Sequence, residues 1–467
     1  MTFLWVFLPA VLILYQLAPG IKYKNGLLLC ASLLFYSWGE PKYVLLMLFS
    51  IAANYLFGLA LGKYKEYKQL FVILAVIVNI GLLFYFKYFN FFADTLNKVS
   101  GGQTLALRDI VLPIGISFYT FQALSYVIDV GRGKVKAQKN IFRLALYISL
   151  FPQLIAGPIV RYSDIEDQLS SRTVDTALAA QGIRRFIVGL SKKVLIANTV
   201  AVAADNIFDL PSDQLSPLIA WMGAALYGMQ IYYDFSGYSD MAIGLGKMFG
   251  FGFNENFNLP YTSTSVQDFW RRWHISLSSW FREYLYIPLG GNRKGIARTC
   301  LNILIVFAVT GLWHGAASNF VAWGLYFGIF LVAERLFLGK LLQKLPAFVC
   351  RIYALLAVFI GWVLFRSHGI KNALLYLMAM VTPAKGKMWS VGEFVSAKTV
   401  IALAAAILFC GVAQRLIIPK LKPVAEKNKV LSTALPYIQI VVLFALFAFC
   451  IISIAAETYN PFIYFRF

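Results

Sequence analysis

Histidine is scarce in this sequence. Among its 467 residues there are only three, His274, His314 and His368. The sequence has no HExxH or GxSxG motif, and no cluster of His, Cys and carboxylate residues suited to a catalytic metal. A GxGxxG motif and a P-loop are also absent. The sequence therefore gives no support to zinc-protease, nucleophile-elbow or nucleotide-binding chemistry, and no bound metal or cofactor is expected.

Cysteine is also rare and never paired in sequence. The five cysteines stand singly, nearly all within apolar runs: Cys30, Cys300, Cys350, Cys410 and Cys450. They form neither CxxC pairs nor a spaced disulfide framework. They are interpreted as small apolar packing residues.

Charged residues make up only 13% of the chain, whereas 60% of its residues are hydrophobic and the mean hydropathy is +0.70. A helix needs about 20 mainly apolar residues to cross a hydrocarbon core of about 30 Å. The chain offers such runs from end to end, which predicts an all-α polytopic membrane protein with roughly ten to thirteen passes or part-passes. The first run, residues 2 to 17, has no basic residue before it and no cleavage site after it, so a retained span is expected.

The net charge of +21 is spread over short loops and forms no single basic stripe. We attribute it to the positive-inside bias and to attraction for anionic lipid, and expect no nucleic-acid partner. Basic residues fall in alternate loops near residues 22 to 24, 63 to 68 and 132 to 139. This pattern predicts that the amino terminus lies outside and that these loops face the cytoplasm.

Three segments depart from the plain pattern of spans. LPIGISFYTFQALSYVIDV, from Leu112, carries polar side chains in an apolar stretch and is predicted to line an interior. FPQLIAGPIVRY, from Phe151, contains Pro and Gly and predicts broken backbone in a re-entrant or cavity-lining segment. Between Tyr162 and Phe208, basic residues at helical spacing predict an amphipathic helix on the cytoplasmic surface.

His314 lies in TGLWHGAASN, within 35 residues that contain no Asp, Glu, Lys or Arg. As one helix this stretch would be about 52 Å long, too long for one crossing and short for two full spans. A break inside the membrane is therefore predicted at the small and polar residues Gly311, Gly315, Ala316, Ala317, Ser318 and Asn319.

Position alone leaves two interpretations of His314 open. A buried neutral imidazole can accept a proton, as a general base must. It can equally serve as a packing residue that hydrogen-bonds neighbouring helices. His368, which follows Arg366 and Ser367 at the end of a span, is expected at the membrane interface.

His274 belongs to QDFWRRWHISLSSWFREYLYIPLGGNR. If residues 269 to 285 form one helix, the aromatic residues lie on one face and His274 at its rim, beside Ser278, Arg271 and Arg282. Such a rim suits an anionic, phosphate-bearing donor at a cytoplasmic entrance. An interfacial helix with Trp anchors and Arg residues on lipid phosphate is the alternative.

These residues carry a family resemblance. RRWHISLSSWFREYLYIPLGGNR followed by TGLWHGA resembles the signature of the membrane-bound O-acyltransferase (MBOAT) superfamily. Upstream, PIGISFYTFQALSYVIDV, AGPIVRY and YYDFSGYSDMAIG resemble the bacterial branch that includes the membrane subunit of alginate O-acetyltransferase. The motifs cover about residues 110 to 320. The resemblance implies one transmembrane domain over residues 1 to 467, a helical bundle that encloses a cavity or tunnel.

The resemblance also implies a site. His314, in the WHG motif, would be the essential catalytic residue, and His274, the second signature histidine, would help to place the donor or the proton path. Asp234, near the membrane edge, is expected to orient neighbouring groups. The predicted substrate- or donor-binding residues are Trp270, Arg271, Arg272, Ser278, Arg282, Trp313 and Asp234.

The expected activity is O-acetyl or short-acyl transfer in a bacterial cytoplasmic membrane, with acetyl-CoA as a donor substrate. The acceptor would be an extracytoplasmic polysaccharide or peptidoglycan, reached directly or through a secreted or membrane-anchored acyltransferase partner. A related branch exports D-alanyl groups to teichoic acids and is the first alternative. A transporter or lipid flippase is an alternative of another class, although the polar motifs occur once, without the internal repeats of many transporters.

Overall fold

The computed structural model describes residues 1–102, 104–384, 386 and 389–456, and within these residues the chain is helical, with no strand. The helices form two compact parts. The first comprises Met1–Phe186 and Ala242–Asn254, and the second comprises Ile187–Met241 and Glu255–Phe467. The all-α prediction is confirmed.

Eight helical segments among the described residues are long and apolar enough to cross a membrane: Val44–Lys63, Lys65–Ser100, Thr176–Phe208, Gly295–His314, Ser318–Leu342, Ala347–Arg366, Ala397–Ala425 and Val430–Ala456. Two shorter apolar helices are Phe3–Leu17 and Ile370–Ala379. The chain is therefore a multi-pass membrane protein, as its composition predicts.

In the first part, α3 (Val44–Lys63) and α4 (Lys68–Leu83) pack against α6 (Ile116–Arg132). Almost every side chain of α6 from Ile116 to Val127 is buried, and so is Asp129, which agrees with a segment that faces protein. Asn54 and Asn79 exchange amide hydrogen bonds of 3.1 and 2.8 Å between α3 and α4, and thereby satisfy polar groups that lipid would not. The first part also contains α1 (Leu8–Leu17), α2 (Ile21–Gly39) and α5 (Phe89–Ser100).

The backbone breaks where the Pro and Gly pattern predicts. Helix α7 (Ile141–Ser149) is followed by the short α8 (Phe151–Leu154) and by a buried non-helical stretch that leads to α9 (Tyr162–Ser170). Gly157 is required there, because a Cβ would lie 2.6 Å from Gln153 Cα. The Tyr147 hydroxyl donates to the Val160 carbonyl at 2.9 Å, so the irregular backbone is hydrogen-bonded inside the protein.

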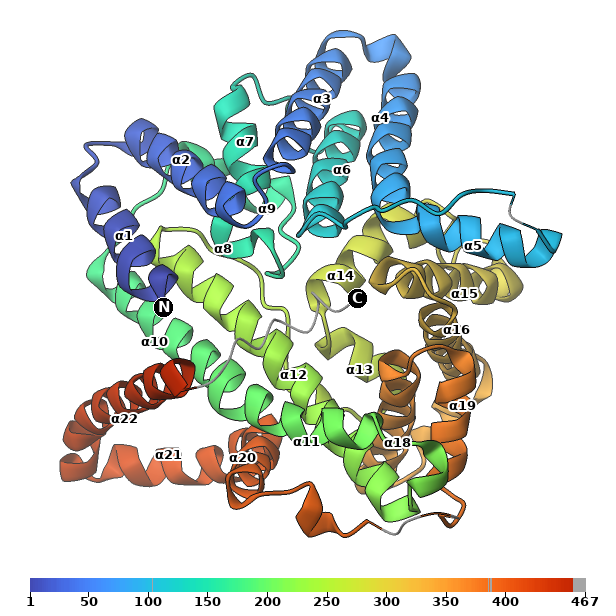
Figure 1. The fold of residues 1–467 in the computed structure, drawn as a ribbon. Helices are drawn as coiled ribbons and strands as arrows, with labels where there is room; N and C mark the ends of the chain where they lie inside the picture. Colours follow the sequence, from blue (N-terminus) through green and yellow to red (C-terminus); the bar gives the residue numbers. More distant parts are fainter. Residues whose placement is uncertain (103, 385, 387–388, 457–467) are drawn as a thin grey trace. The chain divides into compact units, whose positions relative to one another are not determined.

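The second part contains the run from Arg271 to Arg293 and the TGLWHGA motif, and Figure 1 labels the helices α13, α14 and α15 that carry them. Helices α10 (Thr176–Ser191) and α12 (Pro217–Met248) contribute residues to both parts. The other helices of the second part are α11 (Asn198–Phe208), α13 (Val266–Arg272), α14 (Ile275–Phe281), α15 (Gly295–His314), α16 (Ser318–Ala333), α17 (Gly339–Leu342), α18 (Ala347–Arg366), α19 (Ile370–Ala379), α20 (Ala397–Ile407), α21 (Ile418–Lys427) and α22 (Lys429–Ala456).

The prediction of a surface helix between Tyr162 and Phe208 is wrong for its second half. Lys192 and Lys193 begin a π-helical turn, η4 (Lys192–Ala197), and pair with carboxylates of α12. Lys192 Nζ lies 2.6 Å from Asp240 Oδ2, and Lys193 Nζ lies 2.5 Å from Asp234 Oδ1. Lys192 and Lys193 thus form ion pairs inside the second part. Periodicity within one helix does not predict these pairs.

Helices α15 and α16 form a tight antiparallel hairpin, and Figure 1 shows them side by side. A Cβ on Gly311 would lie 2.2 Å from the Phe320 carbonyl oxygen, and one on Gly324 would lie 2.2 Å from the Phe307 carbonyl oxygen. The two glycines therefore allow a closer backbone approach than any other residue would permit. The hairpin fixes the position of the residue at its tip, His314.

Candidate active site

His314 is the last residue of α15, and the chain leaves helical geometry at Gly315 before α16 begins at Ser318. The predicted break at the small and polar cluster is confirmed. The arms, however, are not too short to span: α15 has 20 residues and the helical run from Ser318 has 25. The error arose because each helix includes its charged end, Arg298 in one arm and Glu334 in the other.

Aromatic rings surround the His314 imidazole, which is only 5% exposed. Trp323 lies 5.0 Å from it, Phe365 5.3 Å and Trp313 4.9 Å between ring centroids. The His274 ring is 6.4 Å away. Two of the three histidines of the sequence are therefore neighbours, although forty positions separate them.

His274 does not lie at the rim of a helix. The predicted continuous helix over residues 269 to 285 is wrong: α13 ends at Arg272 and α14 begins at Ile275. His274 sits between them with φ of 45°, a conformation that is uncommon for residues other than glycine, and its side chain is fully buried. His274 therefore does not join Arg271 and Arg282 in the lining of one pocket, and its ring is instead a neighbour of the His314 ring.

Asn256 holds this break together. Its carbonyl oxygen accepts a hydrogen bond from the Ile275 amide at 2.9 Å. Its side-chain Oδ1 accepts from the Ser276 amide at 3.2 Å and from the Ser276 hydroxyl at 2.9 Å. The same Oδ1 lies 3.2 Å from His274 Nδ1. Since an atom that accepts from an amide N–H is an acceptor, His274 must carry its proton on Nδ1.

The second ring nitrogen of His274 is left with a lone pair. Burial lowers the pKa of His274 to about 3, so the ring is neutral across the physiological range. Within the described residues, Nε2 makes no hydrogen bond. The Phe235 ring meets the imidazole edge-on at 4.6 Å and fixes its plane. His274 is thus a neutral acceptor held in one tautomer beside His314.

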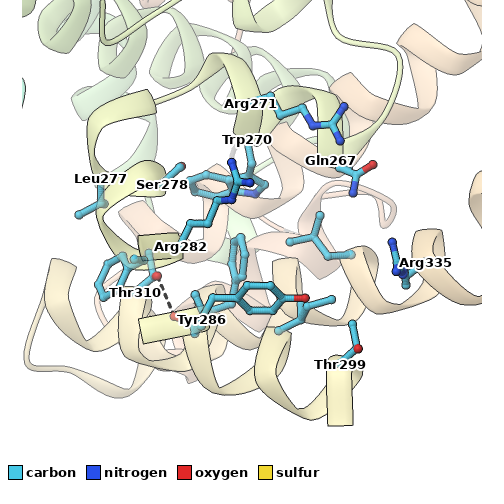
Figure 2. Close-up of a pocket in the computed structure, with 15 residues that line it drawn as sticks. Gln267, Trp270, Arg271, Leu277, Ser278, Arg282, Tyr286, Thr299, Thr310 and Arg335 are labelled. Atoms are coloured by element: carbon cyan, nitrogen blue, oxygen red, sulfur yellow. Dashed lines mark hydrogen bonds between the residues drawn. The ribbon is translucent and has the colours of Figure 1, made fainter. Parts of the chain in front are cut away.

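A pocket of about 290 Å³ includes Ser278, four positions after His274, and Thr310, four positions before His314, in its lining (Figure 2). Its lining contains three arginines, Arg271, Arg282 and Arg335. Figure 2 shows these guanidiniums together with the ring of Trp270. Other residues of the lining include Gln267, Ser278, Tyr286, Thr299, Ile303, Val306, Phe307 and Thr310.

The pocket follows one face of α15. Thr299, Ile303, Val306 and Thr310 recur at helical spacing, so the lining extends about 16 Å along the helix axis. Thr310 is one helical turn from His314. Trp270 forms part of the wall and packs on Trp323 at 5.7 Å, and Trp323 in turn packs on His314. These α15 residues, called the α15 strip, therefore run from the first turns of the helix to one turn before His314.

Arg335 was missed by sequence reasoning because it lies far from the signature run, on the opposite arm of the hairpin. The preceding residue, Glu334, stabilises the wall of the pocket that α13 forms. Glu334 accepts hydrogen bonds from the amides of Val266 at 2.7 Å and Gln267 at 2.9 Å, at the start of α13. A carboxylate at a helix amino terminus also complements the helix dipole. Glu334 thereby positions the helix that carries Trp270 and Arg271.

The remaining predicted residues lie outside the pocket. Arg272 is paired with Asp268, with 2.8 Å between Nε and Oδ1. Asp234 is paired with Lys193 and immediately precedes Phe235, which contacts His274. Trp313 adjoins both imidazoles. The structure therefore brings Trp270, Arg271, Ser278 and Arg282 to the pocket and places Trp313, His274 and His314 together at its side.

Comparison with known proteins places this geometry in a family. Residues 136–379 match the model of the membrane-bound O-acyltransferase family. The chain is 40% identical over 486 residues to the probable alginate O-acetylase AlgI of Pseudomonas putida, with 100% of this chain and 99% of the relative covered. It is 46% identical to the protein of that name from Pseudomonas aeruginosa, over 79% of this chain and 72% of the relative. It is 38% identical to the peptidoglycan O-acetyltransferase of Helicobacter pylori, over 81% and 78%.

Proposed function

The chain belongs to the membrane-bound O-acyltransferase family, and from this we propose that it moves an acetyl or short acyl group from a cytoplasmic thioester donor, acetyl-CoA, to a hydroxyl of an extracytoplasmic polysaccharide. It is a multi-pass membrane O-acyltransferase. The proposal concerns the donor, the direction of transfer and the residues that act. One observation carries it: two neighbouring buried imidazoles lie within about one helical turn of residues that line a pocket with three arginines.

The arginines suit the phosphates of a nucleotide-linked thioester. A guanidinium offers planar, paired donors that match phosphate oxygens. The α15 strip suits a narrow, weakly polar chain that links the phosphates of the donor to its acyl group. We assign the donor phosphates to Arg271, Arg282 and Arg335, and the thioester to the space near Thr310 and Trp270.

Charge distribution supports a cytoplasmic position for the donor. The end of the α15, α16 and α18 helices near the pocket is rich in basic residues: Arg293, Lys294, Arg298, Arg335, Lys340, Lys344 and Arg351. At the opposite end, the hairpin tip, residues 315 to 319, has none, and the end of α18 and the start of α19 add only Arg366 and Lys371. Since basic residues favour the cytoplasmic side, the pocket faces the cytoplasm in this proposal.

The proposed reaction is a direct acyl transfer. The acceptor hydroxyl gives its proton to the His314 imidazole, and its oxygen attacks the thioester carbonyl carbon. The C–S bond then breaks, a new ester C–O bond is complete, and the departing thiolate takes up a proton. No oxidant, metal or further co-reactant is needed for this balance.

His274 supports the same step as a neutral acceptor. With its proton fixed on Nδ1, the Nε2 lone pair can hold the acceptor hydroxyl or receive a proton through His314. Trp270 and Trp323 each bury an indole N–H that has no hydrogen-bond partner within the described residues. These groups are suited to donate to the thioester carbonyl oxygen as negative charge develops on it.

The acceptor is proposed from the relatives. Their names specify alginate and peptidoglycan O-acetylation, so we propose a cell-envelope polysaccharide, reached directly or through a secreted or membrane-anchored partner, at a bacterial cytoplasmic membrane. D-alanyl export to teichoic acid would use the same site with another donor. A transporter would move a solute through purified protein and cleave no thioester.

Substitution of His314 tests the proposal. In purified protein supplied with acetyl-CoA and an acceptor glycan, His314→Ala should lower the rate of thiol release by about 10² to 10⁴, the usual contribution of a general base. Val309→Ala, at an exposed position of the same helix, is the matched control and should keep the wild-type rate. Full activity of the His314 variant at normal protein level would overturn the assignment.

A further inference from the structure

A second pocket, of about 380 Å³, lies in the second part of the chain, and the proposed donor chemistry makes no use of it. It is lined by the end of α11, the loop that follows it, the end of α18 and the start of α19. His368, the third histidine of the sequence, is one of its exposed residues. Its polar lining residues are Asp209, Ser212, Arg366, Ser367, His368 and Asn372.

Contacts along α16 and α18 place the second pocket at the opposite end of the helices from the arginine-lined pocket. At one end the Tyr353 hydroxyl donates to Glu334 at 3.0 Å, next to Arg335 of the first pocket. At the other end Asn319 Nδ2 donates to the Ser367 carbonyl at 3.0 Å. The helices are therefore antiparallel, and 16 residues of helix from Arg335 to Asn319 span about 24 Å.

The second pocket adjoins the surroundings of His314. Phe365 contacts the His314 ring at 5.3 Å. The next two residues along α18, Arg366 and Ser367, line the pocket. The imidazole thus lies close to both pockets: one turn beyond the strip on α15, and one residue from the lining supplied by α18.

The chemistry of the second pocket differs from that of the first. Arg366 lies 2.9 Å from Asp205 Oδ1 and 4.0 Å from Asp209 Oδ1, so carboxylates balance its charge. Phosphates would meet repulsion from these carboxylates, which excludes a second copy of the donor site. The guanidinium also covers the Phe208 ring, which stacks on Tyr376 with 4.4 Å between centroids.

We propose that this second pocket binds a sugar unit of the acceptor. A sugar ring presents hydroxyls that both donate and accept, and an Arg and Asp pair beside Asn and Ser side chains offers both kinds of partner. Leu210, Leu215 and Leu375 also line the pocket and can contact the apolar C–H surface of such a ring. This inference rests on the proposed function, because it supplies the hydroxyl that His314 would deprotonate.

Filling the second pocket tests the inference. Leu375→Trp, on α19, and Ser212→Trp, in the segment that follows α11, each place an indole in the space that the sugar would occupy. Leu374→Trp is the matched control, since Leu374 is an exposed neighbour outside the lining. The probes are short alginate oligomers and short peptidoglycan glycan fragments, and their binding to purified protein is measured by equilibrium dialysis.

Wild-type protein and the Leu374 variant should bind one of these oligomers, and both filled variants should bind it at least about tenfold more weakly, a difference of about 1.4 kcal/mol. Slow thiol release from acetyl-CoA by water, measured without acceptor, should be equal in all four proteins. Unchanged oligomer affinity in the filled variants would overturn the inference, and so would wild-type protein that binds neither probe.

The two proposals fail differently. If wild-type protein never cleaves acetyl-CoA, the proposed function fails, while the dialysis measurement still decides whether sugar binds at this pocket. If acetyl-CoA is cleaved, no glycan binds, and the filled variants lose affinity for a partner protein only, the sugar assignment is wrong. The transferase assignment then stands.

Discussion

Replacement of Asn256 by aspartate should change the pH dependence of the reaction. The substitution keeps the shape of the side chain and sets a carboxylate 3.2 Å from His274 Nδ1. Opposite charges about 4 Å apart attract by about 4 kcal/mol at an effective dielectric constant of 20. One pH unit corresponds to about 1.4 kcal/mol. In the variant, the His274 ring would therefore become protonated at a pH about three units higher than in the wild type.

The sign of the effect follows from Nε2. A proton on that atom removes the lone pair that the reaction uses. In the wild type the pKa of His274 is about 3, so the ring stays neutral in mildly acidic buffer and His274 causes no loss of rate there. The carboxylate raises this pKa, and the rate of the Asn256→Asp variant should therefore fall as pH falls, earlier than in the wild type. The neighbouring titratable ring, His314, is the same in both proteins.

The assay is thiol release from acetyl-CoA at saturating acceptor over a range of pH. Asn256→Ala removes the acceptor for the His274 proton and should lower the maximal rate about tenfold to a hundredfold, the effect of one buried hydrogen bond of about 1 to 3 kcal/mol. Ser239→Ala is the control, because Ser239 accepts only from the other side of the Asn256 amide, at 3.0 Å. Identical pH profiles for wild type and the aspartate variant would refute the role of the tautomer.

Two further predictions concern the pocket and the hairpin. Arg335→Ala should raise the KM for acetyl-CoA by about tenfold to 150-fold, since a hydrogen bond to a charged group contributes about 1.5 to 3 kcal/mol, whereas Arg293→Ala, at the same end but outside the lining, should not; equal KM values would contradict the donor assignment. Gly311→Ala should destabilise the protein by about 1 to 3 kcal/mol in thermal unfolding, as overpacking does, because its Cβ would lie 2.2 Å from a carbonyl oxygen. Gly81→Ala, where nothing lies within 4 Å, is the control, and equal unfolding of the two variants would show that the hairpin tolerates the methyl group.

The sequence predicts those features that depend on composition along the chain. The helical membrane architecture follows from apolar runs, and the break at Gly315 follows from a long uncharged stretch interrupted by small and polar residues. The buried broken segment after Ser149 follows from its Pro and Gly residues. Each of these features is decided within a short window, so no knowledge of distant contacts was needed.

Features that depend on distant partners were missed. Periodicity alone could not show that the chain breaks at His274, because Asn256 stabilises the break from 18 positions earlier. It could not place Arg335 beside Arg271, since the α15 and α16 hairpin brings them to one pocket. From the sequence, Lys193 is interpreted as a surface charge, because its ion pair with Asp234 joins residues 41 positions apart. The roles of the predicted site residues stay predictions, as does the single domain over the whole chain.

The strip along α15 has a consequence for which donors the enzyme can use. It extends about 16 Å from Thr299 to Thr310, with one more turn to His314. In the proposed site, an acyl phosphate held by Arg335, at the Thr299 end of the strip, would be too short for its carbonyl carbon to reach His314. A donor with a long flexible arm between its anionic group and its acyl group would reach both residues. The proposed site would thus select donors by the length of this arm, independently of the acyl group that they carry.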